Sequence, residues 1–143
     1  MTGVYIPREL RDRIAEQARH RCGYCLTPAA LIGSPLEIEH IIPISLGGLT
    51  EEENLWLACS LCNNHKGNRI AARDPLSGEI VVPFFNPRRQ IWTEHFAWGD
   101  AGARMIERTQ VGRVTILALN LNRPSLVFTR RAWITVGWHP PRD

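Results

Sequence analysis

The sequence predicts an α+β fold in which an N-terminal helix and a strand–loop–strand–helix unit precede a mixed, mainly helical C-terminal extension. Three observations support this expectation: two Cys-x2-Cys pairs, an alternating apolar and acidic stretch between them, and apolar residues at helical spacing near both ends of the chain. With 143 residues, 44% hydrophobic and 22% charged, the chain has the length and composition of one globular domain. We therefore expect a single domain, with a core over residues 1–73 and a basic extension over residues 74–143 packed on that core.

The first helix is predicted over residues 7–20. A proline suits its first position, and Leu10, Ile14 and Ala18 recur every four residues, so they share one face of the helix. Directly after this helix, Gly23 permits a tight turn between the first two cysteines.

Two short strands and a second helix are predicted next. Residues 36–42 begin with alternating apolar and acidic side chains, which is typical of a strand, and a proline ends the pairing. A double glycine and the acidic loop at 51–53 follow, and residues 55–58 are apolar enough for a second strand. Cys59 then begins a helix of about three turns, up to residue 72.

The C-terminal half carries weaker signals. Residues 74–78 predict a turn ahead of an apolar stretch, and residues 88–98 predict a helix with aromatic core side chains. Thr109 is suited to cap a further helix, although the β-branched residues that follow leave a strand open. Residues 124–136 predict the final helix.

Charge is distributed unevenly along the chain. Residues 36–53 carry five glutamates and no basic residue, whereas residues 104–142 carry seven arginines against Glu107 alone, so the net charge of +3 averages two regions of opposite sign. Lys66 is the one lysine among 17 basic residues, and arginine is the side chain best suited to bidentate phosphate contacts. A genomic bias toward arginine accounts for this composition equally well.

The sequence argues against membrane insertion and secretion. The longest apolar stretch, residues 80–85, contains a proline and is far shorter than the ~18–20 residues of a membrane span. Residues 1–8 lack the apolar core of a secretory signal, so we expect a cytoplasmic protein. Thiols stay reduced in that compartment, which favours metal binding over disulfides.

The four cysteines predict a structural zinc site. Cys22 and Cys25 form one pair, Cys59 and Cys62 form the other, and four thiolates are the tetrahedral ligand set of structural zinc. The duplicated spacing disfavours the alternatives of four ordinary buried cysteines or a redox pair. Because four thiolates leave no open coordination position, we expect this zinc to hold the fold and take no part in chemistry.

A second pattern lies between and across the cysteine pairs. It consists of Glu39-His40-Ile41-Ile42-Pro43, Gly47-Gly48, Asn54-Leu55 and Cys62-Asn63-Asn64-His65-Lys66. Over residues 22–70 this pattern resembles the motif of HNH endonucleases. The resemblance implies a ββα-metal active site built on the two strands and the helix after them.

Residue roles follow from this resemblance. It implies His40 as general base, Glu39 and Asn63 as ligands of a catalytic divalent cation, Asn54 as a loop-ordering residue and Lys66 as a phosphate contact. A neutral imidazole can take a proton from water, and a carboxylate with an amide oxygen suits Mg²⁺ or Mn²⁺. Since consecutive strand residues point to opposite faces, Glu39 and His40 can serve one site only at a bulge or a strand end.

Further contacts to a nucleic-acid backbone are expected from arginines, with a solvated surface as the alternative. The candidates are Arg69, Arg88, Arg89, Arg130 and Arg131. We interpret His20, His95 and His139 as structural or surface residues, and His65 remains open between a phosphate contact and a structural role.

The predicted function is therefore metal-dependent endonuclease cleavage of DNA phosphodiester bonds, with structural Zn²⁺ and catalytic Mg²⁺ or Mn²⁺ as cofactors. The competing hypothesis is a non-catalytic zinc module that binds nucleic acid, and RNA is a weaker candidate substrate than DNA. Cutting both strands with one site per chain would favour a homodimer.

Overall fold

The computed structural model describes residues 4–142, which divide into two compact units. The first unit holds the chain up to Ile70 together with Asn86–Arg89, and the second holds Ala71–Phe85 and the chain from Gln90 onward. Among the described residues, no helix has the length and apolar content needed to cross a membrane. The expected packing of the extension on the core stays a prediction.

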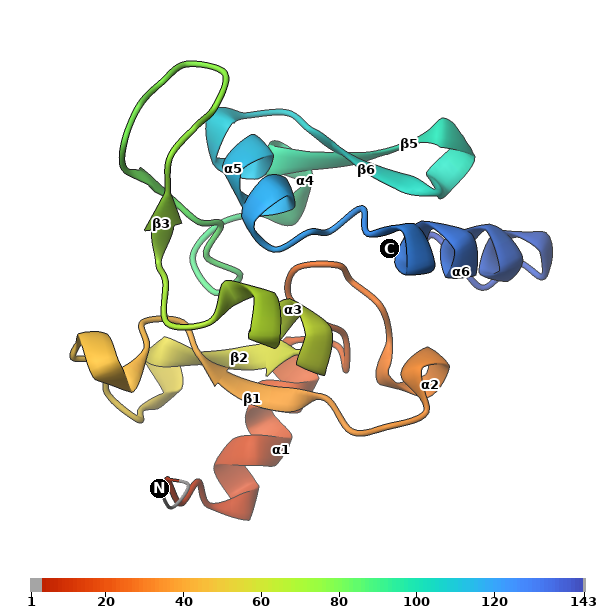
Figure 1. Cartoon of the computed structure of the whole chain (residues 1–143). Coiled ribbons are helices and arrows are strands. Elements are labelled where there is room, and N and C mark those ends of the chain that lie inside the picture. Colours follow the sequence, from red (N-terminus) through yellow and green to blue (C-terminus); the bar gives the residue numbers. More distant parts are fainter. Residues whose placement is uncertain (1–3, 143) are drawn as a thin grey trace. The chain divides into compact units, whose positions relative to one another are not determined.

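The first unit is a two-stranded antiparallel sheet with a helix on each side (Figure 1). Its elements, in chain order, are α1 (Arg8–Gln17), α2 (Ala29–Ile32), β1 (Glu37–His40), the 3₁₀ turns η1 (Ile44–Leu46) and η2 (Glu52–Asn54), β2 (Leu55–Ala58) and α3 (Ser60–Lys66). The strands pair in regular register from Glu37 opposite Ala58 to His40 opposite Leu55. This order is the predicted strand–loop–strand–helix unit, and the α+β expectation is confirmed.

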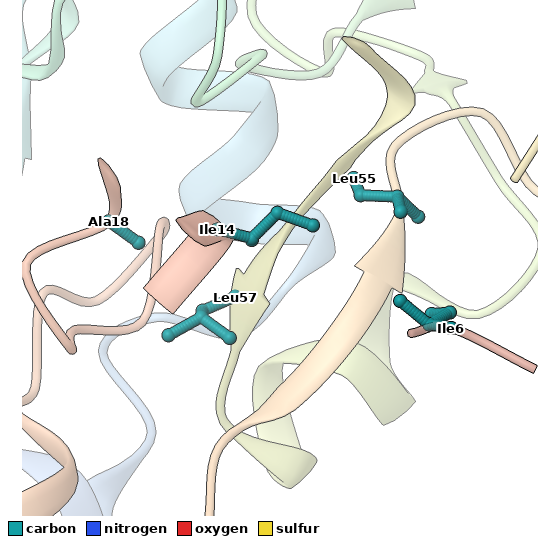
Figure 2. Close-up of a cluster of buried hydrophobic side chains, with 5 residues drawn as sticks. All are labelled: Ile6, Ile14, Ala18, Leu55 and Leu57. Atoms are coloured by element: carbon teal, nitrogen blue, oxygen red, sulfur yellow. The ribbon is translucent and has the colours of Figure 1, made fainter. Parts of the chain in front are cut away.

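The core of this unit lies between α1 and β2. Ile14 of α1 and Ala18, the C-cap of that helix, pack with Leu55 and Leu57 of β2, and Ile6 closes one end of the cluster (Figure 2). Leu55 and Leu57 face the same side because strand side chains alternate. Burial of each of the larger side chains contributes roughly 1.5–3 kcal/mol, so this cluster holds α1 on the sheet.

Helix α3 is shorter than the sequence predicts. It ends at Lys66 after about two turns because Gly67 adopts a positive φ of 58°, a conformation that glycine tolerates and a helix does not continue through.

The second unit combines two small hairpins with three helices. Its elements, in chain order, are β3 (Ala71–Ala72), β4 (Val82–Pro83), α4 (Trp92–His95), β5 (Phe96–Gly99), the 3₁₀ turn η3 (Asp100–Gly102), β6 (Arg104–Glu107), α5 (Gln110–Ala118) and α6 (Pro124–Thr135). The N-cap prediction for α5 is confirmed, since Gly112 N donates to Thr109 Oγ1 at 3.1 Å. The final helix is also confirmed.

The helix predicted over residues 88–98 is wrong. Only the single turn α4 is helical, and Phe96–Gly99 forms β5, which pairs with Arg104–Glu107. Pairing with a partner strand outweighs the local preference here, and the buried ring of Phe96 packs against Phe85 at a centroid distance of 5.2 Å.

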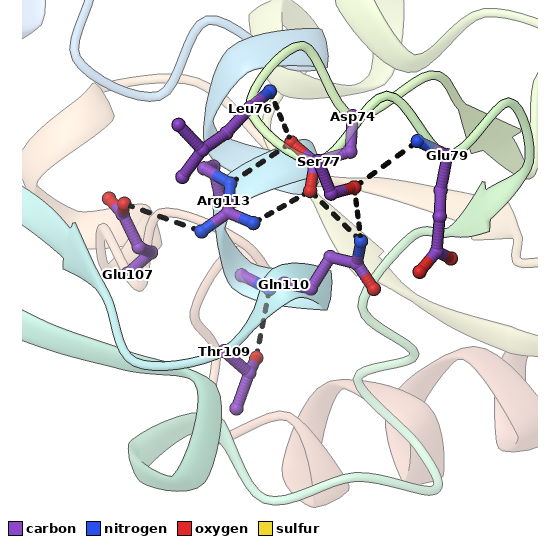
Figure 3. A network of polar contacts seen from close by, with 9 residues as sticks. Asp74, Leu76, Ser77, Glu79, Glu107, Thr109, Gln110 and Arg113 are labelled. Carbon is purple, nitrogen blue, oxygen red and sulfur yellow. Dashed lines mark hydrogen bonds and ion pairs between the residues drawn. The ribbon is translucent and has the colours of Figure 1, made fainter.

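A buried carboxylate fastens the loop between β3 and β4 to α5 (Figure 3). Arg113 donates to both oxygens of Asp74, at 3.0 and 2.6 Å, and Gln110 donates to Oδ2 at 2.9 Å. Leu76 N donates to Oδ1 at 2.9 Å, which holds the turn itself. The hydrogen bonds from Arg113, above all, lower the pKa of Asp74 far below its ordinary range.

We predict that Asp74→Asn lowers the thermal midpoint of the second unit by several degrees at pH 7, because an amide nitrogen then faces Arg113. A carboxyl whose folded pKa is depressed stabilises the fold above its unfolded pKa of about 3.9, and this contribution disappears as the pH falls through the folded value. The difference in thermal midpoint between wild type and Asp74→Asn should therefore narrow as the pH falls below about 4.

Tryptophan fluorescence can follow this transition, since the second unit holds Trp92, Trp98, Trp133 and Trp138. Asp100→Asn is the matched control, because its ion pair with Arg131 lies on the surface and should contribute little. Equal midpoints for wild type and Asp74→Asn at pH 7 would contradict the prediction.

Candidate functional site

Four cysteine side chains converge in the first unit. The sulfur atoms of Cys22, Cys25, Cys59 and Cys62 all lie within 4.8 Å of one another, and all four residues are buried. Two come from the turn after α1 and two from the start of α3. This donor set supports a structural zinc site, as the cysteine spacing predicts.

Both cysteine pairs are held against β2, the first by a backbone hydrogen bond and the second by the chain itself. Gly23 N donates to Leu57 O at 2.9 Å, and a β-carbon at Gly23 would overlap the ring of Trp56. Only glycine therefore lets this turn approach the strand so closely. Cys59 follows β2 directly and is the N-cap of α3.

The thiols differ in their protonation preferences. Burial raises the pKa of Cys22 well above its ordinary value, whereas hydrogen bonding with neighbouring thiols, Cys22 first, lowers the pKa of Cys25 well below it. Zinc binds all its cysteine ligands as thiolates and so removes this difference. The buried all-sulfur donor set fits zinc.

His40 occupies the last position of β1. Its Nε2 lies 2.8 Å from Thr50 Oγ1, in the loop between the strands. Burial and the nearby charge of Lys66 lower the pKa of His40, which favours the neutral imidazole. The register is regular up to His40, so the strand ends there without a bulge in β1 or β2.

Glu39 lies on the opposite face from His40 and is buried. The ammonium group of Lys66 lies 3.2 Å from Glu39 Oε1, with both side chains almost fully enclosed. Burial raises the pKa of Glu39, while the Lys66 charge and the Tyr24 hydroxyl act in the opposite direction. Among the described residues, neither carboxylate oxygen has a donor in good hydrogen-bonding geometry.

Asn63 meets a different carboxylate from the one that the motif implies. Its Nδ2 donates to Oε1 of Glu37 at 2.8 Å. Sequence reasoning missed Glu37, although a signal was present: Glu37 and Glu39 are two residues apart in a strand and therefore share the face that α3 covers.

Asn54 orders the loop between the strands. Its Oδ1 accepts from Ile42 N at 2.8 Å, and its Nδ2 donates to Ile42 O at 3.0 Å and Leu49 O at 2.9 Å. A β-carbon at Gly48 would overlap the Ile42 carbonyl, so the loop closes tightly over the amide. This geometry suits the loop-ordering role that the motif implies.

Lys66 differs from the expectation of an exposed phosphate contact. It is 2% exposed, and its Nζ donates to Ile41 O at 2.9 Å and His40 O at 3.3 Å. Together with Glu39, it joins α3 to the end of β1. The physical reason is local, because a buried ammonium must find acceptors, and the two carbonyls and the carboxylate provide them.

Two of the arginines expected at a nucleic-acid surface are engaged within their own units. Arg130 is fully buried, and its guanidinium donates to Ala103 O at 3.1 Å and Leu121 O at 2.8 Å. Arg88 is half-buried, donates to Leu55 O at 3.0 Å and lies over the ring of Trp56. The expectation of surface contacts is therefore wrong for Arg130.

The remaining arginine candidates are exposed: Arg69, Arg89 and Arg131. Arg89 lines a pocket of about 330 Å³ in the first unit, together with Asn86 and the loop between the strands. Arg131 is paired with Asp100 at 2.7 Å.

The histidines outside the motif differ in exposure. His20 and His65 are exposed. His139 is buried and lies against Gly102 O, and the ring of His95 forms a hydrogen bond with the Thr109 hydroxyl.

Comparison with known proteins agrees with this geometry. Residues 22–69 match the family model described as HNH endonuclease, a span that contains both cysteine pairs and the motif residues between them. This part of the chain matches an HNH endonuclease domain, which indicates a nuclease or nucleic-acid-binding function. No curated protein and no solved structure matches the chain.

We predict that the purified protein holds one zinc ion per chain and that Cys59→Ser abolishes both zinc binding and folding of the first unit, because a serine hydroxyl does not replace a thiolate. Metal analysis and circular dichroism check this. Ser60→Ala, at the neighbouring exposed position, is the control and should keep its zinc. Folded wild-type protein without zinc would contradict the assignment.

We also predict that Asn54→Ala destabilises the first unit by roughly 2–4 kcal/mol, because three hydrogen bonds disappear and buried backbone groups lose their partners. Denaturant unfolding measures this change. Asn64→Ala removes an exposed amide from α3 and should leave stability unchanged. Equal losses in the two variants would argue against the loop-ordering role.

Proposed function

We propose that this protein is a metal-dependent endonuclease that hydrolyses DNA phosphodiester bonds, with His40 as general base and one divalent cation on Glu39 and Asn63. The observation that carries the proposal is the HNH domain match over residues 22–69, a span that contains all three residues, two on β1 and one on α3.

The donor chemistry of the two proposed ligands fits a hard cation. Lys66 approaches the Glu39 carboxylate at Oε1 and the Tyr24 hydroxyl also acts on it, while the hydrogen bond of the Asn63 side chain uses its nitrogen, which leaves Oδ1 available. A carboxylate and an amide oxygen suit Mg²⁺ or Mn²⁺ better than zinc. When bound, such a cation supplies charge stabilisation to the phosphate and the leaving oxygen.

His40 is suited to take a proton from the attacking water. Its two ring nitrogens differ, because Nε2 is engaged with Thr50 Oγ1. If Nε2–H donates to this hydroxyl, Nδ1 keeps its lone pair and can act as the base. The Thr50 contact thereby supports both the tautomer and the ring orientation that the role requires.

Backbone contacts to DNA are proposed for the exposed Arg69 and Arg89 of the first unit and for Arg131 of the second. Arginine contacts to phosphate position a nucleic acid without reading its sequence. These contacts predict binding that weakens as the salt concentration rises.

We predict that the wild-type protein nicks supercoiled plasmid in the presence of Mg²⁺ or Mn²⁺ and that His40→Ala lowers the rate by about 10²–10⁴-fold, the range for loss of a general base. His20→Ala removes an exposed histidine outside the motif and should cut at the wild-type rate. Zinc content is measured in every variant.

Equal nicking by wild type and His40→Ala would contradict the catalytic role. Salt-sensitive binding without cutting under any divalent cation would support the non-catalytic zinc module instead. A matched RNA substrate tests whether cleavage is restricted to DNA.

A further inference from the structure

Glu37 is an exposed acidic residue at the first position of β1 whose carboxylate touches the proposed cation ligand Asn63. The contact follows from the fold. Glu37 pairs with Ala58, Ala58 is followed by Cys59, and the first turn of α3 then brings Asn63 over the start of β1. This turn carries Cys59 and Cys62, two of the four converging cysteines, which keep its position fixed.

The chemistry of an amide makes this contact directional. The Asn63 side chain ends in an oxygen that can bind a cation and a nitrogen that can only donate hydrogen bonds. A carboxylate accepts hydrogen bonds and donates none, so Glu37 selects the orientation in which Nδ2 faces it, as the 2.8 Å contact shows. Oδ1 then lies on the other side of the amide, where it is available to a cation.

The charge of the Glu37 carboxylate also favours cation binding by the Asn63 amide oxygen. A hydrogen bond to a charged carboxylate is stronger than one between neutral groups, and it draws electron density toward the amide oxygen. Glu37 is exposed, and the hydrogen bond that its carboxylate accepts from Asn63 comes from a neutral amide. Glu39, in contrast, has its charge partly balanced by Lys66.

We propose that Glu37 is a positioning residue that holds the Asn63 amide with Oδ1 toward the catalytic cation. The inference rests on the proposed function, because it concerns the cation assigned to Asn63. Since the contact lies on the surface, its loss should change cation binding without unfolding the protein.

The test measures the Mn²⁺ affinity of the zinc-loaded chain of 143 residues by electron paramagnetic resonance of the free ion. We expect Glu37→Ala to weaken Mn²⁺ binding by about tenfold, the lower end of the effect of removing an outer-shell partner. Glu37→Gln can still accept from Nδ2 and should lie between wild type and Glu37→Ala. Glu16→Ala removes an exposed acid from α1 and is the charge-matched control.

A double-mutant cycle separates positioning from direct ligation. If Glu37 acts through Asn63, the Glu37→Ala change has no further effect on Mn²⁺ binding in an Asn63→Ala background. An equal loss in both backgrounds would make Glu37 a ligand itself and overturn the proposal. Wild-type affinity in Glu37→Ala, or wild-type protein that binds no Mn²⁺, would also overturn it.

Cleavage is measured separately on the same samples. Wild-type protein that binds Mn²⁺ through Asn63 and does not cut DNA would contradict the endonuclease function, whereas the Glu37 dependence of Mn²⁺ binding would still support the positioning role.

Discussion

The convergence of four buried thiols is the constraint on which the rest of the first unit depends. A two-stranded sheet with a helix on each side buries too little apolar surface to fix α3 by packing alone. The cysteine cluster joins the turn after α1 to the start of α3, and β2 runs directly into the second pair at Cys59. The contacts that Asn63 and Lys66 make with β1 rely on α3 being held in this place.

The period of a strand then decides which side chains meet α3. Glu37 and Glu39 share the face under that helix, where one contacts Asn63 and the other Lys66. His40 points the other way but is the last residue of β1, so the loop residue Thr50 reaches its ring. The regular register leaves Glu39 and His40 on opposite faces of β1, so the use of both residues in one site stays part of the proposal.

Features that depend on local signals could be predicted from the sequence, whereas contacts that depend on distant chain segments could not. The cysteine spacing, the strand at Leu55–Ala58 and the cap at Thr109 each depend on a few neighbouring residues. The strand at Phe96–Gly99 was missed because its stability comes from a partner strand. Arg130 was misassigned because the carbonyls that bury it belong to other elements of its unit.

Anomalous scattering at the zinc and manganese edges, measured on crystals grown with Mn²⁺, locates both proposed metals in one experiment. We expect a zinc peak among the four cysteine sulfurs and a separate manganese peak against Asn63 and Glu39. Manganese bound only elsewhere, for instance at the acidic loop of Glu51 and Glu53, or no manganese beside α3, would contradict this expectation.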